Sequence, residues 1–333
     1  MSRRENINNK KREITINPVA PFDFDLTLGV YGSFGAQSVD IYSHGCFKRV
    51  LSARGKNYLV TANSSGTVRN PIVTVFLFPP AGEEGDTEER LVERFNWMIG
   101  TELSLAPFYD YVEKEDSTLF QITQKLFGLK PPRTPSVFEA LIIAITEQQT
   151  TLAVASKLRG SLAKLHGESI LVDGCRYYAF PTPEALANAS AEDIRKLGFN
   201  SRKASCIVEV AQRARRGELD LEKLSTLRLE SVVETLTQIK GIGRWTVEYT
   251  MCRGMGRYEA LPANDAVLKA AISKYYKRLE VSEKDVRELL ERFNNFKGYA
   301  ALYLIFAYAL EKYRFDPRAA KSQSQLESWL KLC

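Results

Sequence analysis

The chain has 333 residues, about two domains at roughly 150 residues per domain. Hydrophobic residues make up 44% and charged residues 26%, close to the averages of globular proteins, which argues against wholesale disorder, collagen or coiled coil. No apolar run approaches the roughly 20 residues that span a bilayer, and the polar start shows no secretory signal. We therefore expect no membrane partner and a location in the prokaryotic cytoplasm or the eukaryotic nucleus.

The cysteines and histidines show no metal-binding spacing. The five cysteines form no CxxC pair, and His44 and His166 are far apart, so we expect neither a zinc site nor an iron–sulfur cluster. Reduced, mostly buried thiols are the simpler interpretation. With two histidines in the whole chain, catalysis would depend mainly on carboxylates, lysines or hydroxyls.

The net charge of +6 is concentrated at the start of the chain. Residues 1–13 contain five basic and two acidic side chains, a net +3, which leaves +3 for all the other residues. We expect residues 1–13 to form a basic, disordered arm. A pI near 8.9 permits nucleic-acid binding without demonstrating it.

Residues 14–105 carry a strand-like pattern and are predicted to form an antiparallel sheet domain with one or two helices. Apolar residues alternate with polar or small ones in two runs, at Leu26, Leu28 and Val30 and at Val73, Val75 and Leu77. Residues 63–66 (NSSG) predict a turn, and residues 79–86 predict an exposed acidic loop. An amphipathic helix is predicted over residues 87–99.

Beyond about Pro107 the pattern becomes helical and stays so, which predicts a mostly α-helical domain over residues 106–333. Val137 and Leu141 lie on one apolar stripe of a helix that begins after Pro135. Ser190 predicts the start of another helix, with Asp193 in the place of the usual capping-box Glu. Further helices are predicted at about 201–216, 228–239, 244–254, 265–276, 282–293 and 298–313. The fold class is therefore α+β.

The most informative stretch is residues 236–249 (LTQIKGIGRWTVEY). A helix ends at a glycine, the chain turns over three residues, and a second helix begins at once. Gly241 and Gly243 allow positive φ angles and close approach of a phosphate, while the free N–H groups of the second helix form an anion site. DNA backbone is the obvious anion, and an ordinary tight turn between two helices is the alternative.

A second informative stretch, residues 261–269 (LPANDAVLK), follows about 20 residues later. Asp265 precedes an apolar helix and is well placed to cap it. A capping carboxylate is favoured in its ionised form, which also suits a group that faces a developing cation. Capping and catalysis are compatible interpretations of Asp265.

Together the hairpin, Pro262 and Asp265 resemble the helix-hairpin-helix DNA glycosylase superfamily, and more narrowly its 3-methyladenine DNA glycosylase II branch. Further matches lie at residues 138–149, 180–186, 253–254 and 299–303, so the resemblance covers about residues 135–310. It implies an N-terminal antiparallel β-sheet domain followed by a helix-hairpin-helix glycosylase domain. Residues 14–105 match the family only in general character.

The resemblance assigns Asp265 to the catalytic aspartate, which would stabilise an oxocarbenium-like sugar and orient the attacking water. It also implies DNA contacts around the hairpin. Backbone N–H groups of Gly241, Gly243 and Thr246 would hold a phosphate, and Lys240 and Arg244 would add side-chain contacts. Further candidates for phosphate contacts are Arg133, Arg202 and Lys203, with an ordinary solvated surface as the alternative interpretation.

In some family members, hairpin carbonyls hold a structural monovalent cation. The matching positions are Thr237, Ile239 and Ile242, which would coordinate Na⁺ or K⁺ through main-chain oxygens. No redox or organic cofactor is implied.

The resemblance also implies a pocket for a flipped base. Trp245 stands where the lyase branch carries its Schiff-base lysine, so strand cleavage through an imine is not expected. Trp245 and Tyr249 are candidates to stack on a cationic base, and packing of one or both in the core is the alternative. Tyr303 and Phe306 are weaker candidates, because the family's second pocket tryptophan is missing. Gln149 aligns with the side chain that fills the gap left by the flipped base.

We therefore expect a monofunctional glycosylase, a monomer, that removes alkylated purines from damaged double-stranded DNA in base excision repair. One alternative is a glycosylase for deaminated or oxidised bases, including an oxoguanine type. A second is a non-enzymatic helix-hairpin-helix protein that binds damaged DNA. A third is a protein-interaction module that uses the N-terminal sheet.

Overall fold

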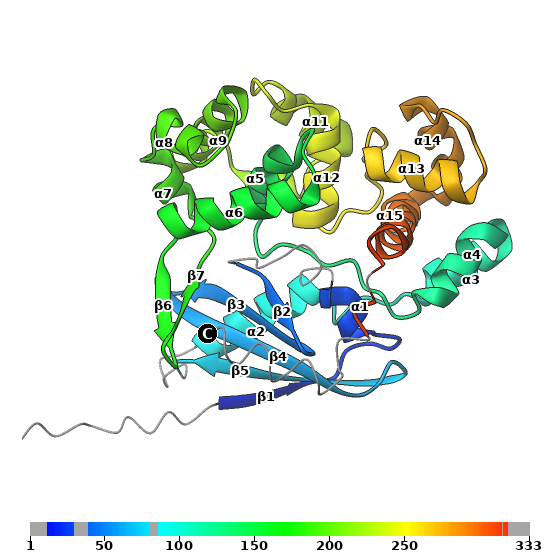
Figure 1. Cartoon of the computed structure of the whole chain (residues 1–333), viewed down its shortest axis with the longest axis horizontal. Coiled ribbons are helices and arrows are strands. Elements are labelled where there is room, and N and C mark those ends of the chain that lie inside the picture. Colours follow the sequence, from blue (N-terminus) through cyan, green and yellow to red (C-terminus); the bar gives the residue numbers. More distant parts are fainter. Residues whose placement is uncertain (1–11, 30–38, 80–85, 315, 319–333) are drawn as a thin grey trace, which may run out of the picture.

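The computed structural model combines an antiparallel sheet with a larger helical part (Figure 1). It describes residues 12–29, 39–79, 86–314 and 316–318. Most of the predicted basic arm and of the predicted acidic loop therefore lies outside the described residues.

The sheet has five antiparallel strands in the order β1-β5-β4-β3-β2. They are β1 (Arg12–Ile16), β2 (Ile41–Ser43), β3 (Cys46–Ala53), β4 (Lys56–Thr67) and β5 (Asn70–Phe78). Val73, Val75 and Leu77 are fully buried, whereas Thr74 and Phe76 between them are partly exposed and Ile72 before them is 38% exposed. The predicted alternation in this strand is therefore confirmed.

The strand predicted from the alternation at Leu26 and Leu28 is wrong, because both residues lie in the short helix α1 (Phe24–Gly29). Asp23 initiates this helix by accepting the Leu26 N–H at 2.9 Å. Every residue of α1 is buried, so the alternation of Leu26 and Leu28 with smaller residues did not distinguish an inner from an outer face. Val30 lies outside the described residues.

The predicted turn at residues 63–66 is also wrong, by a few residues. β4 continues through this stretch to Thr67, which pairs with Asn70, so that Val68 and Arg69 form the turn. Residues 63–66 are mostly exposed at the end of the hairpin. Their polar composition reflects contact with solvent and not a break in pairing.

The predicted helix at residues 87–99 is confirmed as α2 (Thr87–Ile99), which covers one face of the sheet (Figure 1). Leu91, Phe95 and Met98 are buried against strand residues such as Phe47. With α1 and α2, the sheet carries the one or two helices that the sequence predicts.

A second hairpin, β6 (Ser169–Val172) and β7 (Cys175–Tyr178), interrupts the helical part and contacts β3 and β4 (Figure 1). Ile170 and Val172 join a small core with Val50 and Leu59 of the sheet. The domain is mostly helical as predicted, but the helical pattern does not continue through this hairpin. These four-residue strands are stabilised by residues more than a hundred positions away, a contact that local periodicity cannot reveal.

The remaining helices share one large hydrophobic core. They are α3 (Ala106–Glu115), α4 (Ser117–Lys125), α5 (Val137–Glu147), α6 (Leu152–His166), α7 (Pro183–Ala187), α8 (Ala191–Lys196), α9 (Ser201–Arg215), α10 (Leu221–Leu224), α11 (Leu229–Thr237), α12 (Arg244–Gly254), α13 (Ala266–Tyr275), α14 (Glu283–Leu290), a 3-10 helix (Glu291–Phe296) and α15 (Lys297–Tyr313). The predicted helices are confirmed to within a few residues, except that the one at 282–293 continues as the 3-10 helix. Ser190 caps α8 as predicted. Within the described ranges, no helix is both long and apolar enough to cross a membrane.

Helix α5 is the central element. Its residues from Val137 to Thr146 are all buried, and it packs closely along α12. Gly254 permits this approach, because a Cβ placed there would lie only 2.7 Å from the Cβ of Ala140. The carboxyl end of α5 is thereby held beside the amino end of α12, where the predicted site begins.

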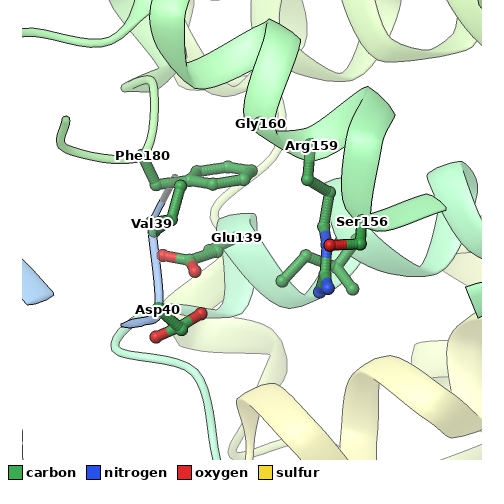
Figure 2. Close-up of a pocket in the computed structure, with 8 residues that line it drawn as sticks. Val39, Asp40, Glu139, Ser156, Arg159, Gly160 and Phe180 are labelled. Carbon is green, nitrogen blue, oxygen red and sulfur yellow. The ribbon is translucent and has the colours of Figure 1, made fainter. Parts of the chain in front are cut away.

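Buried ion pairs connect the sheet to α5. Arg49 of β3 donates to Asp40 and to Glu139 of α5 at 2.5 Å each, and all three side chains are almost fully buried. Asp40 and Glu139 also line a small pocket, with Arg159 of α6 on its opposite side (Figure 2). The sheet and the helical part are therefore joined through buried charges.

Candidate active site

The predicted hairpin lies between α11 and α12. Gly241 has a φ of +106°, and a Cβ there would lie 3.2 Å from the Sγ of Cys206, so both conformation and space favour glycine. Gly243 caps α12 without any side-chain bond. Within the part of the chain that the structure describes, the N–H groups of Gly241, Gly243 and Thr246 have no hydrogen-bond acceptor. These donors at a helix start suit a phosphate.

Gln148, directly after α5, ties the hairpin in place. Its side-chain amide donates to the carbonyl of Gly241 at 2.9 Å and to the hydroxyl of Thr246 at 2.8 Å. This role of Gln148 was not predicted from the sequence. The polar run at residues 147–149, at the end of an otherwise apolar helix, is the signal that could have indicated it.

Gln149 is exposed at the tip of the turn between α5 and α6, with a φ of +47° that non-glycine residues rarely adopt. Lys203 of α9 supports this turn by donating to the Thr146 carbonyl at 2.8 Å and the Thr150 hydroxyl at 2.7 Å. Lys203 is 6% exposed, so its prediction as a phosphate contact is wrong. Its ammonium stabilises the carboxyl end of α5 instead.

The two hairpin glycines give a matched pair of predictions. Gly241→Ala is expected to lower the free energy of unfolding by about 1–3 kcal/mol, because alanine is strained at this φ. Gly243→Ala is expected to cost less, since its φ is −108° and no atom lies within 4 Å of the added Cβ. Urea unfolding of both variants tests this. Equal destabilisation would contradict the assignment of strain to Gly241.

Asp265 is the N-cap of α13. Its Oδ1 accepts the N–H groups of Val267 at 2.8 Å and Leu268 at 2.9 Å, and its Oδ2 accepts the indole N–H of Trp245 at 3.2 Å. These three donors orient the carboxylate. Oδ2 retains acceptor capacity for a reacting group, because an ionised carboxylate oxygen has more than one lone-pair site.

Burial raises the pKa of Asp265 above its ordinary value of 3.8, against the opposing effect of its hydrogen bonds and of Lys269. Any activity that needs the ionised carboxylate therefore begins to fall at a higher pH, on the acidic side of its pH profile, than it would with an ordinary aspartate. A partly buried, oriented carboxylate of raised pKa is typical of functional sites.

The structure brings Trp245 and Tyr249 together beside Asp265. The two ring centroids lie 5.4 Å apart, one helical turn from each other on α12, and both side chains are partly buried. Tyr303, in contrast, is fully buried and bonded to the Tyr109 hydroxyl and the Leu129 carbonyl. Tyr303 is thus a core residue, and Phe306 is buried in the same core. The prediction of Tyr303 as a pocket residue is not supported by this placement.

The predicted phosphate-binding cations differ in their surroundings. Lys240 is exposed and has no ion-pair partner among the described residues. Arg244 donates to Glu230 and Glu248, so its charge is already paired.

Of the further predicted cations, Arg202 is exposed near Gly241. Arg133 is 3% exposed and stacks 3.7 Å from the Trp97 ring. Its prediction as a phosphate contact is wrong, because the guanidinium is buried against the Trp97 ring and cannot reach DNA.

The main-chain carbonyls predicted to coordinate a monovalent cation lie at the end of α11 and in the hairpin. Ile242 donates its N–H to the Ile239 carbonyl at 3.0 Å, which leaves that oxygen a second lone pair. The carbonyls of Thr237, Ile239 and Ile242 are hard oxygen donors suited to Na⁺ or K⁺.

Comparison with known proteins agrees with this arrangement. Residues 142–295 match the HhH-GPD superfamily of base excision DNA repair proteins. The chain is 26% identical to DNA-3-methyladenine glycosylase 2 of Escherichia coli over 87% of this chain and 95% of that protein. The solved 3-methyladenine DNA-glycosylase from Archaeoglobus fulgidus superposes with a TM-score of 0.78 at 27% identity, covering 89% of this chain and 97% of that one.

A third relative is the 3-methyladenine DNA glycosylase of Schizosaccharomyces pombe, solved in complex with abasic DNA. It is 27% identical and superposes with a TM-score of 0.52, covering 59% of this chain and 94% of that one. The fold and the site define a helix-hairpin-helix repair protein. Residues 142–295 form a domain of the HhH-GPD superfamily of base excision DNA repair proteins.

Proposed function

We propose that this protein is a monofunctional DNA glycosylase that removes alkylated purines from damaged double-stranded DNA. The observation that carries the proposal is the Asp265 carboxylate, oriented by three donors and adjoined by the Trp245–Tyr249 aromatic pair. The relatives named 3-methyladenine DNA glycosylases support the substrate class, and the complex with abasic DNA supports DNA as the partner.

Binding begins at the hairpin in this proposal. The free N–H groups of Gly241, Gly243 and Thr246 hold a backbone phosphate without reading sequence. Na⁺ or K⁺ on the hairpin carbonyls would add positive charge beside the same phosphate. Gln149 enters the duplex where the damaged nucleotide has left the stack, at an unstacking cost of a few kcal/mol. The protein acts as a monomer.

The flipped base then stacks near Trp245 and Tyr249, where an electron-rich ring favours a cationic purine. Asp265 stabilises the positive charge that develops on the sugar as the N-glycosidic bond breaks. A water molecule, oriented by the same carboxylate, adds its oxygen to the sugar C1′ and gives up a proton to that carboxylate or to solvent, while the cationic base leaves as a neutral purine. The products are the free purine and an abasic site.

The absence of an amine at Trp245 leads to a prediction about strand scission. We expect 7-methylguanine release from methylated duplex DNA, with strand breaks that appear only after alkali, because no imine forms at an indole. Gel analysis before and after alkali tests this. Breaks without alkali would indicate a lyase, and release of only oxidised or deaminated bases would favour the alternative substrates.

A further inference from the structure

The turn between α5 and α6 is held on both sides of its tip. Gln149 forms the tip, is exposed and has a φ of +47°. A non-glycine residue keeps such a backbone conformation only where the surrounding structure fixes it. The neighbouring residues Gln148 and Thr150 supply that constraint, because each is hydrogen-bonded to a different part of the helical region.

Gln148 attaches the turn to the hairpin. Its side-chain amide donates to the Gly241 carbonyl at 2.9 Å and to the Thr246 hydroxyl at 2.8 Å. Both partners belong to residues whose N–H groups are assigned to a backbone phosphate in the proposed function. The tip therefore lies at a fixed place relative to the phosphate site.

Thr150 attaches the other side of the tip to α9. Its hydroxyl donates to the Gln148 carbonyl at 3.0 Å and accepts a hydrogen bond from the Lys203 ammonium at 2.7 Å. Lys203 donates a second bond, at 2.8 Å, to the carbonyl of Thr146 in the last turn of α5. Lys203 thus holds the chain before the tip directly and the chain after the tip through Thr150.

The bonds of Lys203 are shielded from solvent. Lys203 is 6% exposed, Thr146 is fully buried, and α9 packs against α5. An ammonium that lost these acceptors would stay buried without partners, which costs more than the bonds themselves contribute. The residues around the tip are therefore fixed before DNA binds.

A fixed tip favours base flipping. In the proposed function Gln149 fills the space that the flipped nucleotide leaves, and a side chain on an already ordered backbone loses less conformational entropy when it enters. A looser turn would raise the free energy of the flipped state. It would leave the chemistry at Asp265 unchanged.

We propose that Lys203 and Thr150 are positioning residues that hold Gln149 ready to replace the flipped nucleotide in the duplex. The proposal rests on the proposed function and adds the residues that set the cost of flipping. Both act through the backbone of the turn, and neither is a catalytic residue.

Thr150→Val keeps the shape of the side chain and removes the hydroxyl that joins Lys203 to the Gln148 carbonyl. We expect it to slow single-turnover release of 7-methylguanine paired with cytosine by about tenfold, because a displaced positioning group is costly. Thr150→Ser, which keeps the hydroxyl, should retain most of the rate. The loss should shrink to less than about twofold when an abasic site replaces the cytosine, because an unpaired base is easier to flip. Damage to the fold or to Asp265 would slow release equally from both duplexes.

Lys203→Met tests the other end of the link and should give a similar loss. Lys196→Met on α8 is its matched control, because that side chain is 67% exposed, and it should behave as the wild type. Adding Thr150→Val to Gln149→Ala should have no further effect, since both changes act on the same tip.

Three results would overturn the proposal: an unchanged rate in Thr150→Val, an equal loss on both duplexes, or additive losses when Thr150→Val is combined with Gln149→Ala. Failure of the wild type to release 7-methylguanine from either duplex would instead contradict the proposed function.

Discussion

Asp265→Asn is expected to lower the rate of base release by at least about 10²–10³-fold, because it removes the charge that faces the developing cation. Asparagine is nearly isosteric and can still accept the N–H groups of Val267 and Leu268. DNA affinity should therefore be retained. Single-turnover release of 7-methylguanine and binding to abasic duplex measure the two properties separately.

The same substitution should not destabilise the protein at neutral pH. The pKa of Asp265 is raised in the folded state, so the folded protein favours the protonated form. The stability that this group contributes is present below its ordinary pKa and is lost as the pH rises through the raised value. Asparagine is uncharged and is about as good an N-cap as aspartate. We expect a free energy of unfolding equal to or above that of the wild type.

Asp220→Asn is the matched control, because Asp220 caps α10 through the same kind of bond, to the Lys223 N–H at 3.0 Å. It is expected to leave base release unchanged. Wild-type activity in Asp265→Asn would contradict the assignment of the catalytic carboxylate. Loss of DNA binding together with activity would show that Asp265 acts through the fold and not through charge.

Arg49→Met is expected to destabilise the protein by about 3–5 kcal/mol. Arg49 is 3% exposed and is bonded to two carboxylates that are themselves almost fully buried. Its removal leaves Asp40 and Glu139 buried without their counter-charge. The cost is therefore the desolvation of unpaired carboxylates as well as the loss of hydrogen bonds.

Urea unfolding at neutral pH measures this effect. Arg195→Met provides the control, because Arg195 pairs with Glu192 on the surface and both side chains are at least half exposed. The control should change the free energy of unfolding by less than about 1 kcal/mol. A similarly small effect of Arg49→Met would mean that water or a rearrangement compensates the two carboxylates.

Much of the fold follows from short-range signals. The helix at residues 87–99 follows from its amphipathic period, and the caps at Ser190 and Asp265 depend on side chains that bond the backbone within a few residues. The hairpin glycines are local in the same sense, because a positive φ at Gly241 is a property of one residue. These features could be predicted from local signals, whereas the chemistry proposed for Asp265 was implied by the family resemblance.

Other features depend on partners far along the chain. Leu26 and Leu28 lie in a helix because every side of that segment is buried, and the β6–β7 hairpin exists because it packs on the sheet. The alternation of apolar residues indicates a strand, and a period of 3.6 residues indicates a helix, only when one face of the element is buried. Predictions from these patterns therefore fail where every face is buried or where the packing partner is distant in the sequence.

The sequence by itself determined the positions of the capping carboxylate, the glycine hairpin and the aromatic residues on α12, since each follows from local backbone requirements. Only the tertiary structure decided that Tyr303 belongs to the core and that Lys203 is buried behind the Gln149 turn. The physical reason is that burial and charge pairing are set by which helices pack together, a long-range property that no single segment contains.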